Sequence, residues 1–154
     1  MRPFPGGTSV YCVPPKMKSR LRLRSGSMKV GVGIAKQRHS HGLIQQEREF
    51  VVNVLTPELL PAARVCGSRS GRDGDKFAAS GLTATPGAAV RAVLIEECPV
   101  NLECRVVQEL DLDERTWFLG EVLHVHRTTG FEPEQLLYCG REAYRVIGER
   151  VRPR

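Results

Sequence analysis

The second half of the chain alternates apolar with polar residues, a period of two that extended strands produce. From residue 88 onward four segments show this alternation or nearly continuous apolar runs: Val90 to Ile95, Val100 to Val107, Thr116 to His126 and Tyr144 to Ile147. Residues 111–115 separate the second segment from the third as a hairpin turn. A sheet that closes on itself has no exposed edges, so we predict a mainly β protein, an antiparallel barrel with a few short helices.

A basic cluster follows the first predicted strand, Val30 to Ile34. The cluster consists of Lys36, Arg38, His39, Ser40 and His41. Ser40 is a good N-cap for a helix over Gly42 to Glu49, which leads into a second apolar strand, Phe50 to Leu55. A phosphate at such a helix start meets free backbone N–H groups, the positive end of the helix dipole and a planar arginine fork. The sequence therefore predicts an anion site here, with a solvated basic turn as the alternative.

Two further helical segments are expected before residue 88. Thr56 caps the first, which has Pro57 at its first position and ends before Gly67, with a bend at Pro61. Asp73 caps a single turn that contains Asp75, Lys76 and Phe77 and is closed by Gly81.

Chain length and net charge limit the number of domains and the kinds of binding partner. The chain has 154 residues, enough for one domain, and a net charge of +6. Seven basic and no acidic residues fall within the first 29, so the remainder carries a charge of −1. We expect residues 1–29 to form a poorly ordered basic head rich in Pro and Gly, and residues 30–154 to form the folded domain. A charge confined to the head argues against nucleic-acid binding by that domain.

Other sequence features predict the compartment. No apolar run is long enough to cross a bilayer, and the start lacks the apolar core of a secretory signal. The five cysteines are odd in number and form no C-x-x-C pair, as is typical of reduced thiols. We therefore expect a cytoplasmic protein without a membrane partner.

The four histidines form two H-x-H pairs, His39/His41 and His124/His126. Alternate residues of a strand face the same side, so two such pairs brought together could bind Zn²⁺ or Fe²⁺ in a barrel mouth. The first pair falls at a predicted helix start, where this parity is lost. A metal-binding β-barrel is therefore an alternative, and we assign no metal ligand.

Five segments in order resemble the flavin reductase-like family, over roughly residues 30–149. They are KQRHSHGLIQQEREFVVNVL, the loop CGSRSGRDGDKFAASGL from Cys66, the triplet LEC at Leu102, GEVLHVH from Gly120, and LLYCGREAYRVIGE near the end. The resemblance implies an antiparallel split β-barrel that binds FMN. By the same resemblance Lys36, Arg38, His39, Ser40 and His41 help to hold the FMN phosphate and ribityl chain. Asp75, Lys76 and Phe77 belong to a segment near the flavin, often contributed by the other subunit of a homodimer.

The resemblance also implies an activity. NAD(P)H would donate electrons through bound FMN to a free flavin or a protein acceptor, with no catalytic side chain required. An FMN electron carrier of the flavoredoxin type, which reduces no free flavin, is the alternative within the fold. Residues 1–29 do not match the family's opening segment. This mismatch implies a barrel that lacks its first strands, and in the extreme a non-catalytic remnant with an empty pocket.

Overall fold

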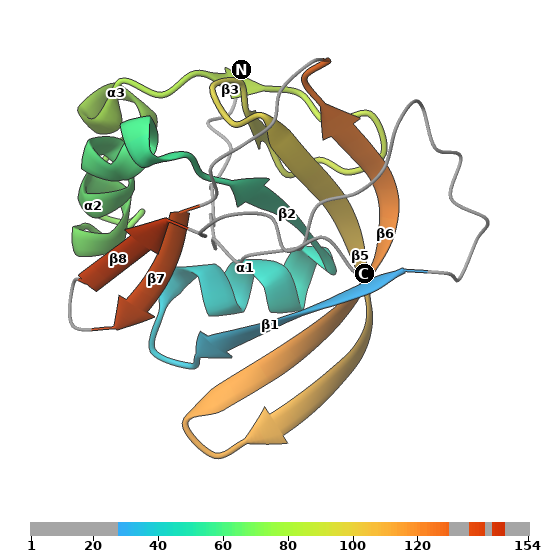
Figure 1. The fold of residues 1–154 in the computed structure, drawn as a ribbon. Coiled ribbons are helices and arrows are strands. Elements are labelled where there is room, and N and C mark those ends of the chain that lie inside the picture. Colours follow the sequence, from blue (N-terminus) through green and yellow to red (C-terminus); the bar gives the residue numbers. More distant parts are fainter. Residues whose placement is uncertain (1–27, 130–135, 141–142, 147–154) are drawn as a thin grey trace, which may run out of the picture.

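The computed structural model describes residues 28–129, 136–140 and 143–146. Within them the chain forms eight strands and four short helices (Figure 1). In order, these are β1 (Lys29–Ala35), α1 (His39–Glu47), β2 (Glu49–Val54), the 3-10 helix η1 (Pro57–Leu59), α2 (Leu60–Ser68), α3 (Lys76–Ser80), β3 (Ala84–Thr85), β4 (Leu94–Ile95), β5 (Val100–Leu112), β6 (Arg115–Arg127), β7 (Leu136–Gly140) and β8 (Ala143–Val146). The predicted mainly β, antiparallel fold with few short helices is confirmed. The predicted head lies outside the described residues except for its last two.

The central feature is a four-stranded antiparallel sheet in the order β1-β6-β5-β2. Strands β5 and β6 form one long hairpin of 13 residues each, joined at the predicted turn. Asp113 in this turn has a φ of 47°, in the left-handed region that Asp tolerates better than most residues. The register shifts between Glu103 and Cys104 and again between Val106 and Gln108, so the hairpin bends.

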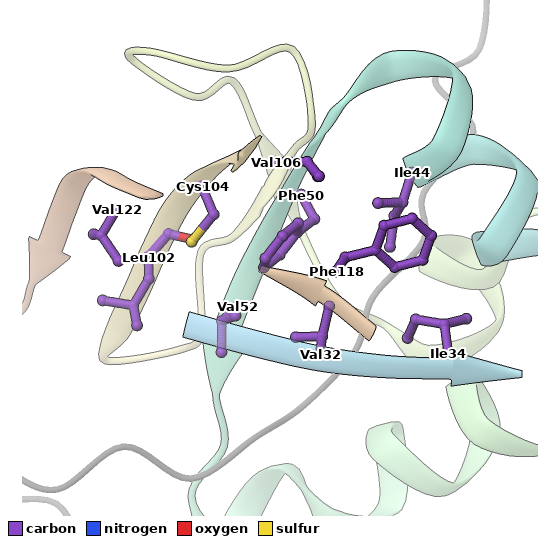
Figure 2. Packing of buried hydrophobic residues seen from close by; sticks show 10 residues of the cluster. All are labelled: Val32, Ile34, Ile44, Phe50, Val52, Leu102, Cys104, Val106, Phe118 and Val122. Carbon is purple, nitrogen blue, oxygen red and sulfur yellow. The ribbon is translucent and has the colours of Figure 1, made fainter. Parts of the chain in front are cut away.

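One face of this sheet carries the main core (Figure 2). Alternate residues of every strand point into it, which is the period of two seen in the sequence. Phe118 on β6 is fully buried, and Ile44 of α1 packs against the same cluster. The other members are Val32, Ile34, Phe50, Val52, Leu102, Cys104, Val106 and Val122. We call this the inner face, and the opposite side of the sheet the outer face.

The helix after β1 begins earlier than predicted. Helix α1 spans His39–Glu47 with Arg38 as its N-cap residue, so Ser40 is the second helical residue and not the cap. The earlier start places His41 and Ile44, three residues apart, on the buried side of the helix. Tertiary packing of that pair therefore determined the helix start, and the prediction of a Ser40 cap was wrong.

The next helices also differ from the predicted single bent helix. Pro57 begins η1, and Pro61 falls in the first turn of α2, where its missing N–H would have had no helical acceptor. Gly67 lies inside α2 and not after its end. The capping residue of α3 is Asp75 and not Asp73, while the predicted closure at Gly81, with φ of 71°, is confirmed.

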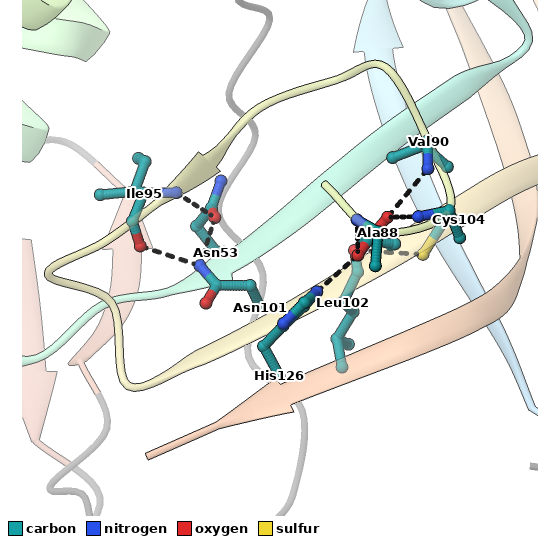
Figure 3. A network of polar contacts seen from close by, with 10 residues as sticks. Asn53, Ala88, Val90, Ile95, Asn101, Leu102, Cys104 and His126 are labelled. Carbon is teal, nitrogen blue, oxygen red and sulfur yellow. Dashed lines mark hydrogen bonds and ion pairs between the residues drawn. The ribbon is translucent and has the colours of Figure 1, made fainter. Parts of the chain in front are cut away.

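A buried carboxylate clamps the loop between β3 and β4 to the sheet (Figure 3). The Glu103 side chain is fully buried and accepts hydrogen bonds from the amides of Ala88 (2.9 Å), Ala89 (2.6 Å) and Val90 (2.9 Å). The Nε2 atom of His126 lies 2.5 Å from its Oε1 atom. The next amide, of Arg91, donates to the Glu49 carboxylate (2.6 Å). Side chains therefore occupy the first two amides of the predicted strand 90–95, of which only Leu94–Ile95 forms β4.

The sequence analysis missed β7, which pairs with β8 near the end of the described chain. Its sequence, LLYCG, is short and lacks the alternation on which the strand prediction depended. The predicted strand 144–147 is present as β8.

Candidate functional site

The turn from β1 into α1 presents the predicted basic cluster. Arg38 has extended backbone angles, φ of −76° and ψ of 139°, and no side chain caps the helix. In the described chain, the Arg38 amide donates to the Ala35 carbonyl (2.9 Å), and the Arg38 carbonyl accepts from the His41 amide (3.0 Å). The amides of His39 and Ser40 have no acceptor among the described residues. Two N–H donors thus point outward from the positive end of α1.

Arg38 is the cation that remains available at this turn. Its side chain is exposed and has no ion-pair partner within residues 28–129, 136–140 and 143–146. Lys36 is also exposed, but its Nζ atom lies 2.6 and 2.8 Å from the two carboxylate oxygens of Asp111 on β5. The guanidinium can therefore turn its fork to an anion, while Lys36 already compensates a carboxylate.

The remaining three residues of the cluster differ in direction. His39 and Ser40 are half-buried at the start of α1, next to the free amides. His41 is buried, with Nε2 2.8 Å from the Thr116 hydroxyl and its ring centroid 5.4 Å from that of Phe118. Its ring thus lies against β6 and holds the helix start on the sheet. The spacing of helical residues alone could have indicated this inward direction.

The second predicted group holds α3 against α2. The Asp75 carboxylate accepts from the amides of Phe77 (2.8 Å) and Ala78 (3.3 Å). Lys76 donates from Nζ to the carbonyl of Cys66 in α2 (2.7 Å), and Phe77 packs in an apolar cluster with α2. No hydrogen bond or ion pair described in the structure joins this group to residues 36–41. Within one chain, these residues hold two helices together.

An open pocket of about 320 Å³ lies elsewhere, and the sequence analysis did not predict it. Its lining consists of Thr56, Glu58, Leu59, Glu97, Pro99 and Thr128. Burial raises the pKa of Glu97, but hydrogen bonds from Thr83 outweigh it, so the net pKa is lowered. Hydrogen bonds from Thr56 and from its own amide lower the pKa of Glu58. Two ionised carboxylates make this pocket a poor place for a phosphate.

The two H-x-H pairs each have other partners. His41 faces Thr116, and His126 faces Glu103 with the His124 ring 4.5 Å away from its own. Within the described part of the chain, no group of three or more His, Cys, Asp or Glu side chains is placed to hold a metal ion. No helix of the described residues is both long and apolar enough to cross a membrane.

The structure is thus a small antiparallel β-domain with an exposed arginine at the turn between β1 and α1. The chain belongs to the flavin reductase-like family: the family model described as "Flavin reductase like domain" matches residues 24–147. This confirms the resemblance on which the predicted cofactor and site depend.

Three solved structures share the fold. A flavoredoxin from Methanosarcina acetivorans is 27% identical with a TM-score of 0.73, covering 88% of this chain and 76% of that one. An FMN-binding protein from Thermus thermophilus is 25% identical with a TM-score of 0.72, covering 82% and 73%. A Shewanella frigidimarina structure described as having a split barrel domain is 20% identical with a TM-score of 0.75, covering 88% and 75%. This likeness confirms the predicted split-barrel fold.

Curated relatives match over a shorter part of their length. An uncharacterized protein from Archaeoglobus fulgidus is 41% identical over 103 residues, which are 67% of this chain and 58% of that protein. A second, from Pyrococcus abyssi, is 35% identical and covered over 59% of its length. The chain thus spans less than two thirds of the curated relatives that it matches.

Proposed function

We propose that this protein binds FMN and transfers electrons from NAD(P)H through it to a flavin or a protein acceptor. The observation that carries the proposal is the exposed Arg38 at the start of α1, which has no ion-pair partner among the described residues and lies beside two amides that lack an acceptor there. This arrangement fits a phosphate, which accepts bidentate bonds from arginine and single bonds from amides. The chain also belongs to a family whose solved relatives include an FMN-binding protein.

Each residue of the turn would have a different role in binding the cofactor. Arg38 would bind two phosphate oxygens, and the amides of His39 and Ser40 would bind a third with the Ser40 hydroxyl nearby. Lys36 would add long-range positive charge, because Asp111 already occupies its ammonium group. His41 would support the site indirectly, because its hydrogen bond to Thr116 holds the start of α1 against β6.

Bound FMN would supply the redox chemistry, accepting a hydride from a nicotinamide and releasing electrons to the acceptor. The protein would bind the phosphate, orient the ring and exclude water. We further propose a homodimer, in which Asp75, Lys76 and Phe77 of one subunit lie near the flavin of the other. This assignment is compatible with their helix-joining role in the subunit to which they belong. Cys66, Cys98 and Cys104 form no disulfide among the described residues, which supports a reducing, cytoplasmic setting.

Titration with FMN, followed by the quenching of flavin fluorescence, tests the cofactor assignment. A hydrogen bond to a charged group contributes about 1.5–3 kcal/mol, so Arg38→Ala is expected to weaken FMN binding by roughly 10- to 150-fold. The control is Arg72→Ala, which removes an exposed arginine from the loop before α3. Failure of the wild-type chain to bind FMN would refute the proposal, as would equal affinity in the Arg38 and Arg72 variants.

A second candidate, a bound-FMN electron carrier, is favoured by the flavoredoxin among the solved relatives at 27% identity. Steady-state oxidation of NADH or NADPH with free FMN or FAD as acceptor separates the two. Turnover with free flavin supports the reductase. Reduction of the bound cofactor without turnover supports the carrier.

A further inference from the structure

The turn after β1 is attached to the tip of the β5–β6 hairpin. Strand β1 ends beside that tip (Figure 1), where the Lys36 amide donates to the Glu114 carbonyl (2.9 Å). The Nζ atom of Lys36 lies 2.6 and 2.8 Å from the two carboxylate oxygens of Asp111 on β5. One residue of the proposed FMN phosphate site is therefore bound to the hairpin through both its backbone and its side chain.

The strand register places Asp111 on the same side of the sheet as α1. Asp111 lies opposite Thr116, which lies opposite Ile34 of β1. Opposite residues of antiparallel strands share a face, with Cβ atoms about 4.5–5.5 Å apart. Ile34 belongs to the core of the inner face, and the Thr116 hydroxyl lies 2.8 Å from Nε2 of His41 in α1. The Asp111 side chain therefore lies on the inner face, beside the start of α1.

The Asp111 carboxylate changes the charge balance of the anion site. Residues 36–41 contain one lysine and one arginine, which together would offer a phosphate a charge of +2. The ion pair with Asp111 offsets the lysine, so the net charge near the turn falls to +1. A phosphomonoester carries a charge of about −1.5 to −2 at pH 7. Arg38 alone therefore does not balance the charge of an FMN phosphate.

The same ion pair contributes little to the stability of the fold. The side chain of Lys36 is 41% exposed and that of Asp111 is 70% exposed, and exposed ion pairs are weak because water and salt screen them. Loss of the Asp111 charge should therefore leave the domain folded. An anion held by Arg38 would still be affected by that charge, since charges near a protein surface interact over several ångströms. The effect of Asp111 on the site should thus exceed its effect on stability.

We infer that Asp111 limits the affinity of this site for the FMN phosphate by neutralising Lys36, and that it thereby keeps FMN exchangeable. The inference rests on the FMN site proposed above and assigns the way in which the flavin is used. A flavin that leaves after each reduction requires moderate affinity, whereas a permanently bound cofactor gains from every available cation. Differences in affinity at one site appear mostly in the dissociation rate, so Asp111 sets how fast FMN leaves. The substrate class is a dissociable, phosphorylated flavin, which favours the reductase over the carrier.

Titration of Asp111→Asn with FMN and with riboflavin, followed by flavin fluorescence, tests the inference. Asn keeps the shape of Asp without its charge. We expect FMN to bind about 3- to 10-fold more tightly, as one unit charge several ångströms from a phosphate predicts, and to dissociate more slowly by a similar factor. Riboflavin has no phosphate, so its affinity should not change. The gain for FMN should decrease as the salt concentration rises.

Two further variants separate the contact with Lys36 from the general charge of the hairpin. Asp113→Asn removes a charge from the same turn, at a residue that has no ion pair among those described and whose φ of 47° Asn also tolerates. It lies farther along the turn and should change FMN affinity by less than about 2-fold. Lys36→Met with Asp111→Asn replaces the ion pair by two uncharged side chains, and this double variant should bind FMN within about 2-fold of the wild type.

The possible results distinguish this inference from the cofactor assignment. A wild type that does not bind FMN would refute both. If the wild type binds FMN but Asp111→Asn binds it no more tightly, or gains equally for riboflavin, only the role of Asp111 is refuted. The same holds if Asp113→Asn gives an equal gain. A double variant that binds FMN as tightly as Asp111→Asn would also overturn the inference, because the carboxylate would then act without Lys36.

Discussion

Replacement of Glu103 by Gln tests whether the buried carboxylate clamp stabilises the domain. Glu103 has no solvent-exposed surface, and its two oxygens together accept three backbone amides and face Nε2 of His126. Gln has nearly the same shape but replaces one acceptor oxygen with an NH₂ donor. In either orientation of the amide, that donor would face an N–H donor of the loop at less than 3 Å.

The expected loss follows from these contacts. A hydrogen bond to a charged group contributes about 1.5–3 kcal/mol, and a buried donor left without an acceptor costs about 1–3 kcal/mol. Loss of the charge together with at least one unsatisfied amide gives an expected decrease in unfolding free energy of about 3–5 kcal/mol, the range for breaking a buried charged pair. At ~2–4 °C per kcal/mol for a chain of this size, Tm should fall by roughly 6–20 °C.

The pH dependence gives a second measurement. Burial raises the pKa of Glu103, but hydrogen bonds from His126 and from the amides of residues 88–90 outweigh it, so the folded pKa lies below the ordinary value of 4.5. Stability from such a group is present above the unfolded pKa and is lost as pH falls through the folded pKa. The wild type and Glu103→Gln should therefore differ most near pH 7 and converge in acid.

Urea unfolding followed by circular dichroism at pH 7 and in steps down to pH 3 supplies both measurements. Glu121→Gln, on the same sheet but partly exposed, is the matched control and should change stability by less than about 0.5 kcal/mol. If Glu103→Gln loses less than about 1 kcal/mol at pH 7, or if the difference does not shrink in acid, the clamp does not stabilise the domain as reasoned.

Three further outcomes are expected from the structure. Burial raises the pKa of the Cys98 and Cys104 thiols to about 12, so under native conditions both should resist alkylation that they undergo in urea; labelling in the folded state would contradict this. A methyl group on Gly120 would lie 2.6 Å from a core phenylalanine ring, so Gly120→Ala should lower Tm through overpacking worth about 1–3 kcal/mol, and an unchanged Tm would show that the core relaxes. Asp75→Ala should cost about 1 kcal/mol in urea unfolding through loss of the α3 cap, whereas Asp73→Ala should cost much less; equal effects would contradict the capping assignment.

The sequence alone determined the fold class. A period of two in residues 100–126, with a polar turn in the middle, specified the β5–β6 hairpin, because only extended strands place alternate residues on opposite faces. Local chemistry also specified the end of α3 at Gly81 and the start of η1 at Pro57, since backbone freedom and a missing N–H act within a single turn.

Tertiary contacts decided what local signals could not. Ser40 is an excellent capping residue by type, yet α1 starts before it, because His41 gains a buried bond to Thr116 that lies 75 residues away in the chain. Likewise, the apolar run from Val90 begins as a loop because Glu103 binds the amide of Val90 and Glu49 binds the amide of Arg91.

The candidate site likewise has features that the sequence determined and features that the tertiary structure decided. The sequence brought Lys36, Arg38, His39, Ser40 and His41 together, because they are neighbours in the chain. Only the fold assigned them different surroundings: Lys36 pairs with Asp111, His41 turns inward, and Arg38 stays exposed. A residue type fixes which bonds a side chain can make, whereas its partners come from strands that pair only when the whole sheet forms.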